Sequence, residues 1–305
     1  MIKETIKKIV NKINGSTRIE TSINDNLLYQ IRRQYIEEKI LSCRESGVCD
    51  AKYCDSEIIV SLTTYGRRLD YVAYAIESVM QQSMKANRII LWLAKEDFVK
   101  PLPPALRAQM SRGLEIRETS DTRSYKKIIP ALAAYPDSVI ITVDDDVMYD
   151  FELIGRLITA YQNDPSNIYA GRTHVIKYDD KGKLTPYLNW NLNSSDNSSP
   201  QNNFFTGVGG VLYPPHSLHP DVLKEDVFMN ICKTADDVWL NVMSRLAGTK
   251  VIKVRTKSKL GDEYVLISDI QDMGLLRVNV WEGSMNDQCI NNVLGKYNLS
   301  NFEIR

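Results

Sequence analysis

Three consecutive carboxylates follow an apolar stretch in the middle of the chain. Residues 139–143 are Val-Ile-Ile-Thr-Val, and Asp144, Asp145 and Asp146 come next. Such a stretch is typical of a buried strand in an α/β sheet, and ligands of these sheets bind just beyond the carboxyl ends of the strands. Adjacent carboxylates repel each other unless a cation lies among them, and Mg²⁺ or Mn²⁺ takes oxygen ligands and often shares them with phosphates. We therefore predict a metal and diphosphate site; the alternative is a polar turn that caps the next helix.

A second acidic pair occurs far downstream. Asp236 and Asp237 begin a stretch of helical character that ends before Gly248. Acids at a helix start complement the helix dipole, which is the simplest reading of this pair. A carboxylate that lies within hydrogen-bond reach of a hydroxyl can also act as a general base. The two acidic groups can meet only through tertiary structure.

The elements that would position these acids alternate between strand and helix. Strands are predicted at 57–63, 88–93, 114–117 and 139–143, and helices at 69–82, 103–111, 125–134 and 151–162. Pro130 should kink or interrupt the third of these helices. This order predicts an α/β fold with a mixed, mainly parallel sheet flanked by helices. Further strands are expected at 168–172, 204–213 and 249–254, and a final helix at 285–294.

The two ends of the chain differ from this core. Residues 1–55 predict an N-terminal helical extension, with a helix at 24–41 and a small, polar linker at 42–55. Residues 56–254 would form the catalytic domain. Residues 255–305 would form a tail that serves as a lid, an acceptor-binding element or an oligomer contact.

Composition narrows the class of protein. The 305 residues are 43% hydrophobic and 25% charged, as in an ordinary soluble domain. Lys+Arg and Asp+Glu both number 38, so the chain is not expected to have the overall positive charge that attracts nucleic acid. Five cysteines without paired metal-type spacing predict reduced thiols and a cytoplasmic setting. The Lys-rich first helix could make a peripheral contact with the inner face of a membrane, although packing on the domain is the simpler reading.

The ordered set of motifs resembles the bacterial nucleotide-sugar glycosyltransferases of the GT-A fold, of the kind found in capsule or lipopolysaccharide synthesis. The matching segments are the strand 58–63 with its Thr-Thr-Tyr-Gly-Arg loop, residues 78–83, the acids 144–146 as a DXD motif, the glycine-containing segment 207–213 and residues 235–237. The resemblance covers residues 57–254. It implies a metal-dependent transfer of a sugar, from a UDP-sugar, to a hydroxyl of a saccharide or lipid-linked saccharide acceptor.

The resemblance also assigns roles. It implies nucleotide binding by Thr63, Thr64, Tyr65, Arg67, Lys126, Asp144 and Asp145, with Arg123 and Lys127 as further phosphate contacts. It implies Mn²⁺ or Mg²⁺ binding by Asp146 and Asp144, and a base at Asp237 with Asp236 beside it. Gly209, Gly210 and Trp190 would face the donor sugar or the acceptor, and Trp239 is a further aromatic candidate. These residues also have simpler, structural explanations: a βα turn for the first loop, a solvated helix start for the basic residues and a core position for the tryptophans.

One departure from the family pattern concerns the metal. Many members supply a third ligand, often a histidine, near the C-terminus, whereas His174, His216 and His219 all precede Asp237. Water and diphosphate, or Asp262 or Asp269, would then complete the metal shell. Two other functions stay open: a metal-dependent nucleotidyltransferase or phosphohydrolase that uses the same acids, and a non-catalytic nucleotide-sugar-binding protein if Asp237 points away from the donor.

Overall fold

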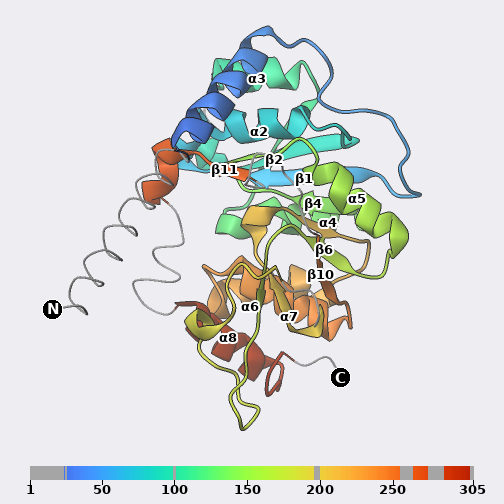
Figure 1. The fold of residues 1–305 in the computed structure, drawn as a ribbon, viewed down its shortest axis with the longest axis vertical. Helices are drawn as coiled ribbons and strands as arrows, with labels where there is room; N and C mark the ends of the chain where they lie inside the picture. Colours follow the sequence, from blue (N-terminus) through green and yellow to red (C-terminus); the bar gives the residue numbers. More distant parts are fainter. Residues whose placement is uncertain are drawn as a thin grey trace, which may run out of the picture.

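A seven-stranded sheet forms the centre of the computed structural model, which describes residues 24, 26–98, 101–195, 200–254, 264–273 and 285–302 (Figure 1). In sheet order the strands are β10 (Val251–Lys253), β6 (Ile168–Ala170), β9 (Val211–Tyr213), β4 (Val139–Thr142), β1 (Ile58–Thr63), β2 (Arg88–Ala94) and β3 (Leu114–Thr119). Neighbours are parallel except where β9 pairs with β4 and β6. The predicted mixed, mainly parallel α/β fold is confirmed.

The register of β1 and β4 brings the predicted site together. Ile58 pairs with Val139 and Ser61 pairs with Thr142, so the two strands end at the same edge of the sheet. The loop that follows Thr63 therefore lies beside Asp144. Both strands are apolar because helices cover both faces of the sheet, as is usual for parallel sheets.

Alternate residues of β1 face two separate hydrophobic clusters. Ile58, Val60 and Leu62 pack with α2 (Val72–Met80), α3 (Pro104–Met110) and α5 (Leu153–Asn163). Ile59 faces the other way, toward α4 (Ile129–Ala134). A larger cluster holds α6 (Glu225–Ile231), α7 (Asp236–Leu246) and α8 (Met285–Lys296), which form the lower part of the molecule in Figure 1.

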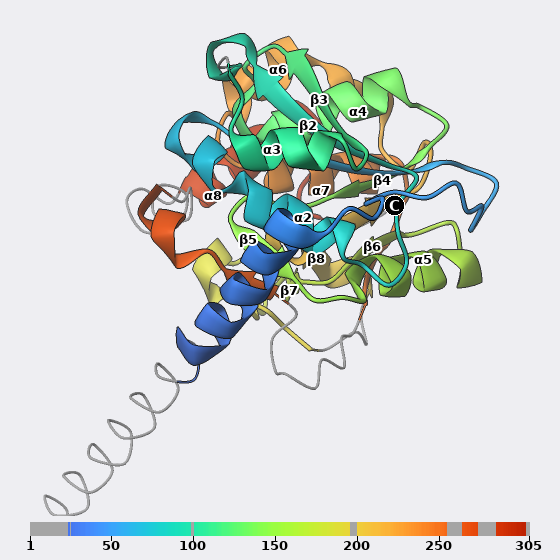
Figure 2. The ribbon, with the colours of Figure 1, turned by 90° about the horizontal axis from the view of Figure 1, so that it is seen from above.

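Two segments far apart in the sequence, the helix near the N-terminus and residues 264–270, pack beside one short strand that follows β4. The strand β5 (Val147–Tyr149), which the sequence did not predict, pairs with β11 (Tyr264–Leu266). A helix over residues 26–42 lies next to α2 (Figure 2), and its Ile36 packs with Met148 and Ile270. Residues 43–57 are without helix or strand, and Val48 within them packs against the core.

Two predicted elements differ in the structure. The expected strand over 204–213 is divided, because a 3-10 turn at Gly207–Gly209 separates β9 from β8 (Asn203–Phe205), which pairs with β7 (Thr173–Val175). The expected helix over 125–134 is a 3-10 helix at Arg123–Lys127 followed by α4, with Pro130 in the first turn of α4, where proline is tolerated. Among the described helices, none has the length and apolar character that a membrane span requires. The Lys-rich first helix and the tail positions 255–263 and 274–284 lie outside the described residues.

Candidate functional site

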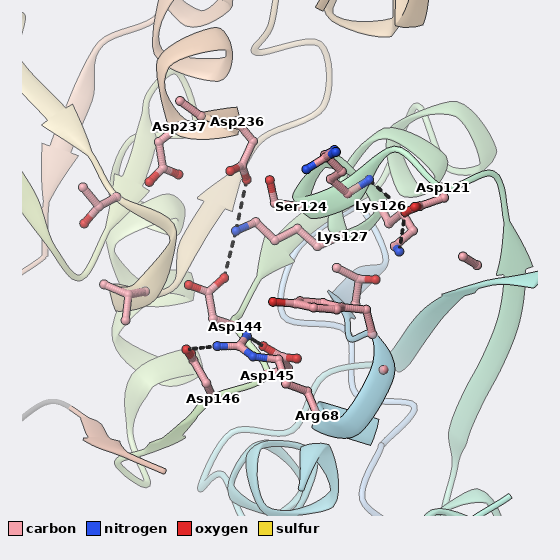
Figure 3. Close-up of a pocket in the computed structure, with 18 of the residues that line it drawn as sticks. Arg68, Asp121, Ser124, Lys126, Lys127, Asp144, Asp145, Asp146, Asp236 and Asp237 are labelled. Carbon is pink, nitrogen blue, oxygen red and sulfur yellow. Dashed lines mark hydrogen bonds and ion pairs between the residues drawn. The ribbon is translucent and has the colours of Figure 1, made fainter. Parts of the chain in front are cut away.

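Both acidic groups of the sequence face one cavity of about 1570 Å³ at the carboxyl ends of β1 to β4. Asp144, Asp145 and Asp146 line it from the end of β4, and Asp236 and Asp237 line it from the start of α7 (Figure 3). The fold therefore joins two segments that are about 90 residues apart. Asp237 lines the cavity and does not point away from it.

Arg68 binds two of the three consecutive acids. Its guanidinium donates to Asp145 Oδ1 at 2.6 Å and to Asp146 Oδ2 at 2.7 Å. Thr64 Oγ1 donates to the other oxygen of Asp145 at 2.6 Å. Arg68 is buried, and a planar guanidinium suits paired carboxylates. Asp145 is thus held inside the protein, while Asp144 and Asp146 are more exposed.

Lys127 connects the two acidic groups. Its Nζ lies 2.8 Å from Asp144 Oδ1 and 3.1 Å from Asp236 Oδ2, as the dashed lines in Figure 3 show. Burial lowers the pKa of this ammonium, but the attraction of Asp144, Asp236 and Asp237 outweighs burial and raises it. Lys127 therefore stays charged and fixes the distance between the end of β4 and the start of α7.

Asp237 has weaker partners than its neighbours. Its carboxylate accepts the backbone N–H of Gly207 at 3.1 and 3.2 Å. Burial, and then repulsion by Asp236, raise its pKa to about 7. A carboxylate whose pKa lies near neutrality is well matched to taking a proton from a substrate.

Charge balance around the cavity favours a bound cation. Eight acids line it against six cations, which leaves a charge of −2 if all are ionised; the acids are the five of the two acidic groups with Glu96, Asp97 and Asp121, and the cations are Arg68, Lys95, Arg123, Lys126, Lys127 and Arg172. Burial first, and repulsion between these acids next, raise the pKa of Asp145 to about 7 and also raise the pKa of Asp146. A divalent cation would relieve this repulsion, because hard metals prefer carboxylate oxygens.

The predicted metal ligands fit only in part. Asp144 and Asp146 line the cavity and offer oxygen atoms. Within the described residues no three Asp, Glu, His or Cys side chains are grouped so that they could hold a metal ion. Asp269, one expected third ligand, instead bonds to Tyr29 and lies 3.1 Å from Arg33, away from the cavity. The other, Asp262, lies outside the described residues. A metal here would need phosphate or water oxygens to complete its shell, as the sequence allowed.

The other end of the cavity lies at the ends of β1, β2 and β3. Thr63, Tyr65 and Lys126, to which the resemblance assigned nucleotide binding, line it there. Lys126 Nζ donates to Asp121 at 2.8 Å. Arg123 also lines the cavity and has φ of 57°, a left-handed conformation that non-glycine residues adopt only rarely. Backbone strain of this kind gathers at functional sites.

Several predicted residues have other surroundings. Arg67 is exposed and does not line the cavity, so the adjacent Arg68 is the arginine that reaches the acids. Gly209 and Gly210 pack against Arg172 and Leu153, where a Cβ atom would come within 2.4 and 2.9 Å. Trp190 is buried and donates to the carbonyl of Thr185 at 3.0 Å. Close packing, and not contact with a sugar, accounts for these three, and Trp239 is likewise a core residue.

Residues that sequence reasoning missed are Arg68, Arg172 and Gly207. Gly207 occupies a narrow position, because a Cβ atom there would lie 2.7 Å from Lys127 Nζ and 3.4 Å from Asp237 Oδ1. Its glycine-rich context was visible in the sequence, but the contact with Lys127 was not. Arg68 was hidden beside Arg67, since which of two neighbouring arginines turns inward depends on the 3-10 helix at Gly66–Asp70.

Comparisons with known proteins give one similar solved structure to report. No protein-family model matches the chain, and no curated protein matches it. One similar solved structure is a CMP:2-keto-3-deoxy-manno-octonic acid synthetase complexed with CTP; it has a TM-score of 0.42 and 12% identity, and covers 73% of this chain and 99% of that chain. That protein is a synthetase by its name. The predicted enzyme class of glycosyltransferase finds no support in these comparisons and is not carried forward.

Proposed function

We propose that this protein is a metal-assisted nucleotidyltransferase that joins a nucleotide to a sugar. The cavity would hold a nucleoside triphosphate at the ends of β1 to β4 and a sugar beside α7. The sugar hydroxyl would attack the α-phosphorus, the bond from that phosphorus to pyrophosphate would break, and Asp237 would accept the hydroxyl proton. The products are a nucleotide-activated sugar and pyrophosphate.

The observation that carries this proposal is that carboxylates from two distant segments meet in one cavity. Asp237 Oδ1 and Asp144 Oδ1 lie within 3.5 Å of one point, the position that a Cβ on Gly207 would occupy, so the two oxygens are at most about 7 Å apart. A hydroxyl bound at Asp237 would therefore lie near a phosphate whose metal ion Asp144 would hold. This geometry suits attack on phosphorus itself, since reacting atoms must come within about 3–3.5 Å of each other.

The residues have distinct tasks in this reaction. Lys127 holds Asp144 and Asp236 in place and adds positive charge where the phosphates would lie. Arg68 fixes Asp145 and Asp146, so that Asp146 keeps one orientation toward the cavity. Mg²⁺ or Mn²⁺, held by Asp144 and Asp146, would neutralise charge on the phosphates and on the leaving group. Asp237 takes the proton because its pKa of about 7 makes it a stronger base than an ordinary carboxylate.

The test is a screen with two readouts. CTP, UTP, ATP and GTP are each incubated with the protein, a panel of sugars and Mg²⁺ or Mn²⁺, and pyrophosphate and nucleotide-linked sugar are measured together. In parallel, nucleotide sugars are offered and released nucleoside diphosphate is measured. We expect pyrophosphate and a new nucleotide sugar in equal amounts, and none with EDTA. Nucleoside diphosphate from a nucleotide sugar, with no pyrophosphate from any triphosphate, would overturn nucleotidyl transfer.

Asp146→Asn tests the metal side of the same proposal. Losing this carboxylate should weaken metal-dependent nucleotide binding by at least about 10–100-fold, the loss usual even for a residue that only supports a metal ligand. The matched control is Asp137→Asn, because the carboxylate of Asp137 is 87% exposed and lies outside the cavity. Titration calorimetry with and without Mg²⁺ measures the binding. Equal loss in the absence of metal would show that Asp146 acts by another route.

A further inference from the structure

Arg172 lines the cavity on the side of α7, away from the nucleotide end. It directly follows the turn at the end of β6, and its side chain is half-buried. One guanidinium nitrogen donates to the hydroxyl of Thr206 at 2.9 Å. Across the part of the chain that the structure describes, Arg172 makes no ion pair.

This contrasts with the other buried or half-buried cations of the cavity. Arg68, Lys126 and Lys127 each bind at least one carboxylate within 2.8 Å. His174, which is close enough to Arg172 for the arginine to affect it, stays neutral, because burial and then Arg172 lower its pKa to about 3. Asp237 and Asp287 act electrostatically on Tyr187, as Arg172 does, yet among the described residues neither forms an ion pair with Arg172. A half-buried guanidinium without a counter-ion is costly unless a ligand supplies one.

Arg172 and the proposed base, Asp237, bind to two adjacent residues of the cavity wall. Arg172 binds the side chain of Thr206, and Asp237 binds the backbone of the next residue, Gly207. The two functional groups are therefore anchored on consecutive residues. Tyr187, which also lines the cavity, is buried and packs against Phe204 and Trp190 in the core.

We infer that the sugar substrate carries an anionic group, and that Arg172 binds this group while Asp237 faces the reacting hydroxyl. The inference rests on the proposed function for the role of Asp237. The anion is a carboxylate, as in a sugar acid, or a phosphate ester, as in a sugar phosphate, because a guanidinium binds both in a bidentate manner. Arg172 is thus a specificity-determining residue of the second substrate.

The experiment separates nucleotide binding from sugar binding. The full chain is first titrated with CTP and UTP in the presence of Mg²⁺, which tests the nucleotide side alone. Binding of glucuronate, glucose 6-phosphate and glucose is then measured by saturation-transfer NMR with the nucleotide present. We expect at least one of the two anions to bind about 10–100-fold more tightly than glucose, the range of a hydrogen bond to a charged group. Which of them binds shows whether the site takes a carboxylate or a phosphate.

Variants connect the preference to one side chain. Arg172→Gln should remove the preference for the anion, Arg172→Lys should keep part of it, and Arg107→Gln, an exposed arginine of α3, should leave it unchanged. Circular dichroism checks that each variant is folded. Equal binding of all three sugars, binding of none, or a preference that survives in Arg172→Gln would overturn the inference. A preference for the anion without nucleotide binding would leave the anion site standing and would remove the proposed function.

Discussion

The two acidic groups that meet in the cavity are neutralised in different ways. At the end of β4, Asp145 and Asp146 share the guanidinium of Arg68 at 2.6 and 2.7 Å, and Thr64 supplies a further hydrogen bond to Asp145. At the start of α7, Asp236 shares one ammonium with Asp144, and Asp237 receives only a backbone N–H. The first group is fixed by a rigid, bidentate partner, whereas the second keeps a carboxylate that is free to take a proton.

The first group is therefore suited to holding a metal ion, and the second is suited to accepting a proton. A carboxylate that is bound to an arginine keeps its direction, which suits a metal ligand and its support. A carboxylate that is buried near other acids has a raised pKa, which suits a base. Raised pKa values occur in both groups, at Asp145 and at Asp237, but only Asp237 lacks a side-chain hydrogen-bond donor among the described residues. The geometry, and not the pKa alone, distinguishes their roles.

The largest effect should come from removing the base. Asp237→Asn keeps the shape of the side chain and its contact with Gly207 but cannot accept a proton. We expect the rate of product formation to fall by about 10²–10⁴-fold, the usual contribution of a general base. Nucleotide affinity should change by less than about twofold. Steady-state kinetics and titration calorimetry measure the two quantities.

Asp226→Asn is the matched control for this variant, because Asp226 is also in the first turn of a helix but is exposed. Its activity should equal that of the wild type. If Asp237→Asn lost nucleotide binding to the same degree as activity, the acids of α7 would serve in nucleotide binding and not in proton transfer. The distinction between the two acidic groups would then fail.

The next effect concerns stability. Arg68→Gln leaves Asp145 and Asp146 without their shared cation, and an uncompensated buried charge lowers the free energy of unfolding by about 3–5 kcal/mol. Arg67→Gln changes the exposed neighbour and should shift the same quantity by less than about 0.5 kcal/mol. Urea unfolding followed by circular dichroism gives both values. Similar values for the two variants would mean that the acids of β4 are not held by Arg68.

The fold was predictable to a large extent because it depends on patterns that lie close together in the sequence. The segments that became β1, β2 and β4 are mostly hydrophobic, as buried parallel strands are. The helix at α7 carried both start and end signals, from Asp236 to Gly248. The divided strand at 204–213 was less predictable, since β8 and β9 pair with partners in different sheets and only tertiary structure decides that.

Site residues were predictable from the sequence only where their position at the end of a strand or at the start of a helix places them in the cavity. Asp144, Asp146 and Asp237 lie at element ends and face the cavity as expected. Arg68, Lys127 and Arg172 depend on contacts across the fold. The sequence presented two adjacent arginines without showing which of them turns inward, and it did not show that both adjacent lysines, Lys126 and Lys127, are buried. Gly209 and Gly210 were misread because close backbone packing and ligand approach both require glycine.

A smaller effect concerns the pH dependence of the base. Burial and then Asp236 raise the pKa of Asp237 to about 7, and only the ionised form accepts a proton. We therefore expect kcat/KM to rise about tenfold per pH unit below 7 and to level off above it. Asp236→Asn removes one source of repulsion, so the rising part should move to lower pH, and activity at pH 6 relative to pH 8 should increase by up to about tenfold. Glu225→Gln, at an exposed helix start, should leave the profile in place. A profile that Asp236→Asn does not move would exclude Asp237 as the titrating group.

The smallest effect tests the point where the two acidic groups meet. A methyl group at residue 207 would lie 2.7 Å from Lys127 Nζ, so Gly207→Ala must displace the end of that flexible side chain. Because a lysine end moves at little cost, we expect the free energy of unfolding to change by less than about 1 kcal/mol, in the range of ordinary substitutions. The displaced ammonium no longer bridges Asp144 and Asp236, however, so activity should fall by about 3–10-fold, equivalent to roughly 1 kcal/mol. Gly295→Ala, in α8 with no atom within 4 Å of the new methyl group, is the control and should leave activity unchanged. Full activity in Gly207→Ala would mean that the two acidic groups act without the bridge that Lys127 makes between them.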